Sequence, residues 1–237
     1  MPTPPAAPQR PRLGAVLPVR VWDLPTRVFH WLLAASVFGA LATAWAGGNA
    51  MVWHMRLGLL ILALLVFRGL WGVVGGRWSR FASFIYGPGT VMRYLRGQAR
   101  PDEHLEVGHN PIGSLSVFAV LGVLAVQVAT GLVADDEIAT TGPLNHLVTT
   151  AQGLSATHWH HGFGQWLIVG LVGVHVAAIA FYRWVKSKDL LRPMLLGDKA
   201  LPPGTPASRD TVATRALALG LAGACAMLAV WLYRQGG

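Results

Sequence analysis

Cysteine is almost missing from this sequence, with one residue, Cys225, among 237. A single thiol cannot form a disulfide framework within the chain. It also cannot supply the thiolates that a cysteine-based zinc site or an iron–sulfur cluster needs. Any metal site that this chain forms alone must therefore use other ligands.

Charged residues are also scarce, at 12%, whereas hydrophobic residues make up 53% of the chain. Soluble domains average about 25% charged residues, so this balance indicates that much of the chain lies in membrane lipid. The net charge of +9 does not indicate nucleic-acid binding, because Lys and Arg lie between long apolar runs and form no basic stripe on a polar domain.

Five apolar segments are long enough to cross a bilayer as helices, which takes about 20 residues each. Asp23 as N-cap and Pro25 in the first turn predict where the first helix begins, and Gly47 with Gly48 predicts its end. The expected spans are residues 27–46, 52–74, 113–134, 162–184 and 212–233.

Positive residues gather before the first span, between the second and third, and between the fourth and fifth. The opposite loops hold only Arg56 and Arg234, and the longest of them begins with Asp135. By the positive-inside rule, the N-terminus is expected in the cytoplasm and the C-terminus outside. Residues 1–17 read as a disordered tail and not as a signal peptide, because they lack a continuous apolar core.

Two loops are long enough to hold short helices. The positive loop after the second span contains GRWSRFASFIYGPGTVMRYLRG, which is basic and aromatic and is expected to lie at the membrane surface. The acidic loop on the other side is expected to hold a short helix over LNHLVTTAQGL.

Histidine within a bilayer is costly, and its presence there indicates a functional site. His161 and His175 are 14 residues apart in the fourth span, which gives about 21 Å of rise and returns to within about 40° of the starting direction. His160 lies about 60° from His175 by the same arithmetic. His161 is therefore the preferred ligand for a metal at its depth, and His160 is the alternative.

Chain direction supplies a second histidine at each depth. His30 lies near the start of the first span and matches His175, whereas His54 begins the second span and matches His161. Two imidazoles on opposite sides of a flat macrocycle complete six-coordinate iron, but structural zinc would need four protein ligands around one point. The sequence therefore predicts two haems stacked across the membrane, bound without thioether bonds because C-x-x-C-H is absent.

Further residues are expected near the haems or at the membrane interface. Arg56 on one side, and Arg27 or Arg68 on the other, would pair with haem propionates or extend to lipid headgroups. His158, His104, His109 and His146 are expected to face solvent or the membrane interface. Trp22, Trp53, Trp71, Trp78, Trp159 and Trp184 lie near span ends and are expected to form aromatic belts.

The chain resembles the bacterial cytochrome b561 family, which includes the b-type cytochrome subunits of nickel–iron hydrogenases. The resemblance rests on RVWDLPTRVFHWLL, VWHMRLGLL, GHNPIG and HWHHGFGQWLIVGLVGVH, and it covers about residues 18–196. It implies an all-α membrane protein whose four-helix bundle holds two b-type haems, with His30 and His175 on one and His54 and His161 on the other.

The resemblance further implies electron transfer in the bacterial inner membrane between quinone and a periplasmic redox protein, either a hydrogenase or a c-type cytochrome. The alternative is a stand-alone haem oxidoreductase that acts on a small molecule such as superoxide, with quinone as co-substrate. Residues 197–210 are expected to form a linker. The fifth helix, within residues 211–237, departs from the family core and would either dock a second membrane subunit or anchor the chain in lipid.

Overall fold

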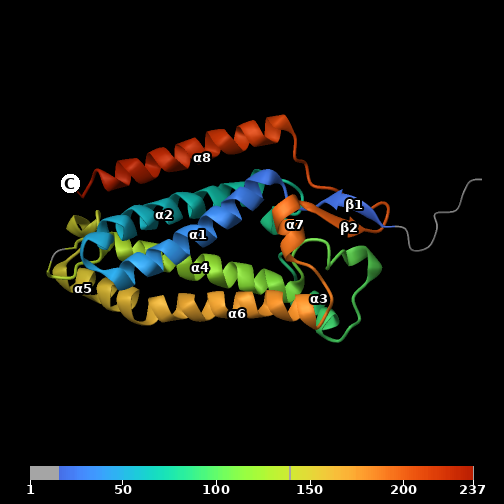
Figure 1. The fold of residues 1–237 in the computed structure, drawn as a ribbon, viewed down its shortest axis with the longest axis horizontal. Helices are drawn as coiled ribbons and strands as arrows, with labels where there is room; N and C mark the ends of the chain where they lie inside the picture. Colours follow the sequence, from blue (N-terminus) through green and yellow to red (C-terminus); the bar gives the residue numbers. More distant parts are fainter. Residues whose placement is uncertain (1–15, 139, 237) are drawn as a thin grey trace, which may run out of the picture.

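The computed structural model describes residues 16–138 and 140–236, and most of this part of the chain is helical (Figure 1). Within it, five helical segments are long and apolar enough to cross a membrane: Leu24–Ala46, Gly48–Val74, Pro111–Val133, Thr150–Trp184 and Val212–Tyr233. The prediction of five membrane-spanning helices is therefore confirmed.

Four of these segments form a bundle, and the fifth lies against its outside (Figure 1). Helix α2 (Met51–Val74) packs against α1 (Leu24–Ala46), α4 (Pro111–Val133) and α8 (Val212–Tyr233). The fourth span consists of α5 (Thr150–Trp159), a π-helical turn η5 (His160–Gly164) and α6 (Gln165–Trp184). Helix α6 packs against α4.

Helix α1 begins and ends where its sequence signals predict. The carboxylate of Asp23 accepts the Thr26 backbone N–H at 2.9 Å, with Pro25 in the first turn. Gly47 ends the helix with a φ of 64°, a conformation that favours glycine. A short 3-10 turn, η1 (Gly48–Ala50), then leads directly into α2.

Asp23 also joins the start of α1 to the end of α2. Its side chain is fully buried and accepts hydrogen bonds from the indole N–H of Trp71, the backbone N–H of Gly76 and the hydroxyl of Ser79. Trp71 is 0% exposed, and Trp22 and Trp78 are only 7% and 6% exposed. The expectation of a lipid-facing belt is therefore wrong for these three tryptophans, because they pack inside the protein.

A two-stranded antiparallel sheet closes one end of the bundle. Strand β1 (Leu17–Arg20) pairs with β2 (Asp198–Leu201), which follows the short helix α7 (Leu191–Leu196). Arg20 fixes this sheet to the start of α8 through ion pairs with Asp198 and Asp210. The expected linker over residues 197–210 thus contains a strand, and most of the expected tail lies outside the described residues.

The remaining short elements lie in the loops. The basic loop contains η2 (Phe81–Ser83), α3 (Pro88–Leu95) and η3 (Pro101–Glu103), so a short helix is present where one was expected. The acidic loop was expected to form one short helix over LNHLVTTAQGL. The first part of this segment forms the 3-10 turn η4 (Asn145–Leu147), and the second part begins α5, which continues into the fourth span. We call the end with β1, β2, α3 and α7 the sheet end, and the opposite end, with α5 and η1, the α5 end (Figure 1).

Candidate functional site

The first histidine pair joins α1 and α6. The rings of His30 and His175 lie 6.4 Å apart between centroids, with 49° between their planes. Nδ1 of His30 is buried and has no hydrogen-bond partner in the described part of the chain. These two residues were expected to pair, and the structure brings them together.

The second pair lies nearer the α5 end and differs from the expectation in one residue. The ring of His54, on α2, faces His160 with 5.9 Å between centroids and 89° between the planes. His161 is exposed, and no ring contact between it and His54 occurs among the described residues. The structure therefore brings His54 together with the alternative partner, His160.

The rings of this second pair are each held by a backbone carbonyl. Nδ1 of His54 lies 2.9 Å from the carbonyl oxygen of Ala40, and Nδ1 of His160 lies 2.8 Å from that of Gln127. A carbonyl can only accept, so Nδ1 is the donor in both rings, and Nε2 is the nitrogen that would be available to a metal. This is the arrangement in which a histidine is oriented as a metal ligand.

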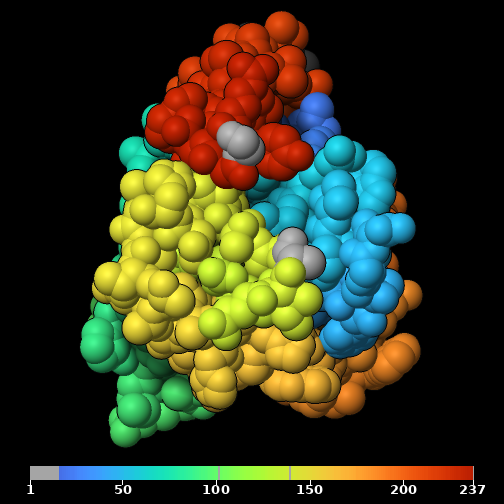
Figure 2. Space-filling model, turned by 90° about the vertical axis from the view of Figure 1, so that its left-hand side faces the viewer, coloured from blue at the N-terminus to red at the C-terminus, as the bar shows by residue number. Residues whose placement is uncertain are grey.

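A large cavity surrounds the second pair. It has a volume of about 840 Å³ and is lined by residues of α1, α2, α4, the segment after α4 and the fourth span. Four histidines are among them: His54, His158, His160 and His161. Asp135, Asp136 and Glu137 line it as well, and no Lys or Arg is among the described lining residues. Viewed from the α5 end, α5 and the segment after α4 cover much of the bundle, beside the turn between α1 and α2 (Figure 2).

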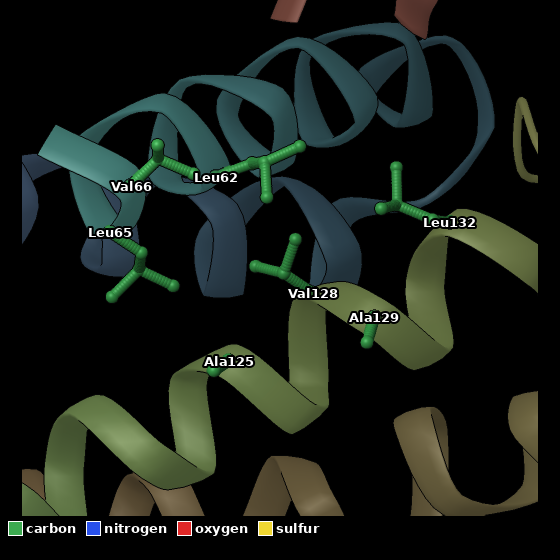
Figure 3. Close-up of a pocket in the computed structure, with 7 residues that line it drawn as sticks. All are labelled: Leu62, Leu65, Val66, Ala125, Val128, Ala129 and Leu132. Carbon is green, nitrogen blue, oxygen red and sulfur yellow. The ribbon is translucent and has the colours of Figure 1, made fainter. Parts of the chain in front are cut away.

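A smaller cleft of about 280 Å³ lies between α2 and α4. Figure 3 shows the seven side chains that line it, all of them aliphatic: Leu62, Leu65, Val66, Ala125, Val128, Ala129 and Leu132. None of the seven carries a hydrogen-bonding side chain. This cleft therefore offers packing space for an apolar group but no ligand for a metal.

The three arginines suggested as propionate partners differ in environment. Arg68 is 3% exposed, its guanidinium lies 4.4 Å from the Phe81 ring centroid, and its Nη1 is buried without a hydrogen-bond partner among the described residues. Arg27 donates to the carbonyl of Leu195, and Arg56 lies over the Trp53 ring. Nε of Arg27 is also buried without a partner among the described residues, so both arginines have a free donor for an anionic group. Arg68 is the more deeply buried of the two, because the side chain of Arg27 is partly exposed.

His109 is a functional candidate that the sequence did not indicate. Its ring packs between those of Trp22 and Phe84, with centroid distances of 4.7 and 4.6 Å. Burial lowers the pKa of His109 to about 3, so the ring is neutral at pH 7. Its Nδ1 is buried and has no partner in the described structure. His109 was expected to face solvent or the membrane interface, and its side chain is partly buried, whereas His104 and His146 are exposed as expected.

The donor set fits haem better than a protein-only metal site. In the described part of the chain, no group of three or more His, Cys, Asp or Glu residues is arranged to hold a metal ion. Metal–imidazole bonds of about 2.0–2.1 Å mean that rings roughly 6 Å apart can place one metal ion between two nitrogens. Each pair would thus be able to hold one haem iron between its two imidazoles.

Comparison with known proteins shows similarity to b-type cytochromes, which contain haem. A family model described as prokaryotic cytochrome b561 matches residues 21–197. The probable Ni/Fe-hydrogenase 1 B-type cytochrome subunit of Escherichia coli (strain K12) is 26% identical over 190 residues, which cover 66% of this chain and 80% of that protein. The probable Ni/Fe-hydrogenase B-type cytochrome subunit of Bradyrhizobium diazoefficiens is 22% identical over 214 residues, covering 76% and 85%. No solved structure gives a significant match.

Proposed function

The chain belongs to the prokaryotic cytochrome b561 family, and on that premise we propose that it uses two b-type haems to connect the quinone pool with a periplasmic redox partner. Family membership itself makes the chain a multi-pass membrane cytochrome b that transfers electrons across the membrane. The number of haems, the quinone and the partner are the proposed parts.

The observation that carries the proposal is the presence of two histidine pairs at different depths of one bundle. His30 and His175 would hold the haem nearer the sheet end. His54 would hold the other, together with a histidine at the start of the π-turn: helix spacing favours His161, and the contacts favour His160. Haem supplies reversible one-electron chemistry, while these side chains fix its iron and tune its potential.

The orientation follows from charge. Helices α3 and α7 and the end of α6 lie at the sheet end (Figure 1). These elements and the loops that join them to the spans carry Arg77, Arg80, Arg93, Arg96, Arg183, Lys186, Lys188 and Arg192. The positive-inside rule supports a cytoplasmic sheet end in a bacterial inner membrane, and therefore a cytoplasmic N-terminus and a periplasmic C-terminus. The α5 end would then face the periplasmic partner.

The partner is inferred from the relatives, whose names describe hydrogenase cytochrome subunits. A hydrogenase or a c-type cytochrome would dock at the α5 end, and quinone would exchange electrons near one face of the membrane. Helix α8 lies outside the bundle against α2, with large apolar side chains exposed, including Leu219, Met227 and Trp231. This face suits lipid or a second membrane subunit.

A stand-alone enzyme that acts on superoxide receives less support. An anionic substrate requires positive charge beside the haem that it meets, but the cavity at the α5 end is lined by acidic residues and by no Lys or Arg among the described residues. The structure therefore offers no specific observation for this alternative, and we retain electron transfer with quinone as the redox substrate.

Haem content and spectra test the proposal. The purified protein should give two haems per chain in a pyridine haemochrome assay, and a low-spin b-type spectrum when oxidised and then reduced. Addition of a quinol should reduce the haems. A ratio of one haem or none per chain, or haems that a quinol does not reduce, would contradict the proposal.

A further inference from the structure

The fourth membrane span contains an irregularity at the place where it supplies a haem ligand. Residues His160–Gly164 form a π-helical turn between α5 and α6. A π-turn places one extra residue in an α-helix and is frequent at functional sites. We propose that this turn makes His160, and not His161, the iron ligand opposite His54, with Gln127 and Gly131 of α4 positioning its ring. This inference rests on the proposed function, because it assigns a residue to the haem at the α5 end.

The π-turn explains why His160, and not His161, faces His54. In an uninterrupted helix, His161 would lie about 40° from the direction of His175, and His160 about 60°. The π-turn contains one extra residue but does not add the rotation of about 100° that this residue would give in an α-helix. The 15 steps from His160 to His175 therefore rotate the side-chain direction as much as 14 steps of a regular helix do. His160 thereby takes the direction that spacing alone assigned to His161.

Gln127 holds His160 at two points. Its side-chain Nε2 donates to the backbone carbonyl of His160 at 2.7 Å, and its own backbone carbonyl accepts from Nδ1 of the His160 ring at 2.8 Å. One residue of α4 thus fixes both the backbone at the π-turn and the tautomer of the ring. No described hydrogen bond orients the ring of His161 in this way.

Two glycines provide the space that this arrangement needs. A Cβ at Gly131 would lie 2.7 Å from Cε1 of His160, which is closer than the ring allows. A Cβ at Gly164 would overlap Oε1 of Gln127 and would lie 2.8 Å from Nε1 of Trp159. Glycine at these positions therefore lets α4 approach the turn closely enough for Gln127 to reach it.

A matched pair of variants tests the assignment. His160→Gln should lose one of the two haems, so that the pyridine haemochrome ratio falls from two to about one per chain, with the haem of His30 and His175 retained. His161→Gln should keep both. The retained haem shows that each variant has folded, because a chain that fails to fold would lose both.

A second set of variants tests whether Gln127 and Gly131 of α4 position the ring of His160. Gly131→Ala and Gln127→Leu should shift the electron paramagnetic resonance signal and the midpoint potential of the haem at the α5 end, and leave those of the other haem unchanged. Gly122→Ala is the control on the same helix, because a Cβ there meets nothing within 4 Å. Unchanged signals in both α4 variants would overturn the positioning role.

The outcomes separate this inference from the proposed function. A wild-type ratio below two haems per chain contradicts the proposed function itself. A wild-type ratio of two, combined with haem loss in His161→Gln, overturns only the assignment to His160. The same holds if both variants lose the haem or if neither does.

Discussion

The ring of His160 stands 5.9 Å from the ring of His54 and almost perpendicular to it, although His161 has the better spacing to His175 in a regular helix. The difference arises within five residues, because His160–Gly164 form a π-turn. A one-residue change in helix register can therefore exchange two adjacent histidines as ligands while the rest of the bundle stays as the sequence predicts.

The pairing of histidines predicts which haem each variant loses. His30→Ala or His175→Ala should remove the haem nearer the sheet end, because each removes one of the two imidazoles that would hold its iron. His54→Ala should remove the other haem. Potentiometric titration of each purified variant should show one of two components lost. Equal loss of both components in all three variants would show that the pairs do not bind haem independently.

Most of the helical architecture is predictable because its signals are local. Asp23, Pro25 and Gly47 lie within a few residues of the ends of α1, and their effects depend on neighbouring backbone groups. Continuous apolar runs identify the spans because their length must match the bilayer. The sheet is different: Leu17 pairs with Leu201, and no local pattern indicates a partner so distant in the chain.

The candidate site is predictable in part for a similar reason. Chain direction predicts that His30 and His175 lie at the same depth, and the structure places their ring centroids 6.4 Å apart. The π-turn depends instead on contacts across helices, from Gln127 to the backbone of His160 and from Gly131 to its ring, which a single-helix calculation omits. His109 was also missed, because its burial comes from Trp22 and Phe84 in other segments.

Arg68 should raise the reduction potential of a haem near the sheet end. Its buried guanidinium has an unpaired Nη1, and a nearby positive charge favours the reduced form of a haem. Arg68→Met should lower that potential by on the order of 60 mV, which corresponds to about tenfold for one electron. Arg68→Lys should retain more of the potential, and Arg77→Met, at an exposed position of the same end, serves as the control. An unchanged potential in Arg68→Met would show that Arg68 does not act on the haem.

His109 should make the protein less stable in mild acid. Its pKa is lowered from 6.5 to about 3 by burial, so the unfolded chain binds a proton more readily than the folded one does. Its contribution to stability is fully present above about pH 6.5 and is lost as the pH falls towards 3, by about 1 kcal/mol per pH unit. Thermal unfolding of the detergent-solubilised protein between pH 4 and 8 measures this slope. His109→Phe should flatten it, and identical slopes for the two proteins would contradict the burial of a neutral ring.

The ion-pair network of Asp210 should hold α8 and the sheet together. Asp210 pairs with Arg20 of β1 and with Arg215 of α8, and its side chain is only 5% exposed. Burial raises its pKa, but the hydrogen bonds from Arg215 and from the Leu24 backbone N–H, together with the positive charges of Arg215 and Arg20, outweigh this effect and leave the pKa below its usual range. The stability that it contributes is therefore present above about pH 3.9 and is lost as the pH falls through the lowered pKa. Asp210→Asn should reduce the free energy of unfolding by about 1–2 kcal/mol at pH 7, because two partly buried guanidinium groups lose their charged partner. Trypsin should also cleave faster after Arg209, an exposed residue whose backbone is then held less firmly. Asp189→Asn is the matched control, since its pair with Arg183 is exposed and should contribute almost nothing. Equal trypsin cleavage after Arg209 in both variants would show that α8 is held by its apolar contacts with α2 alone.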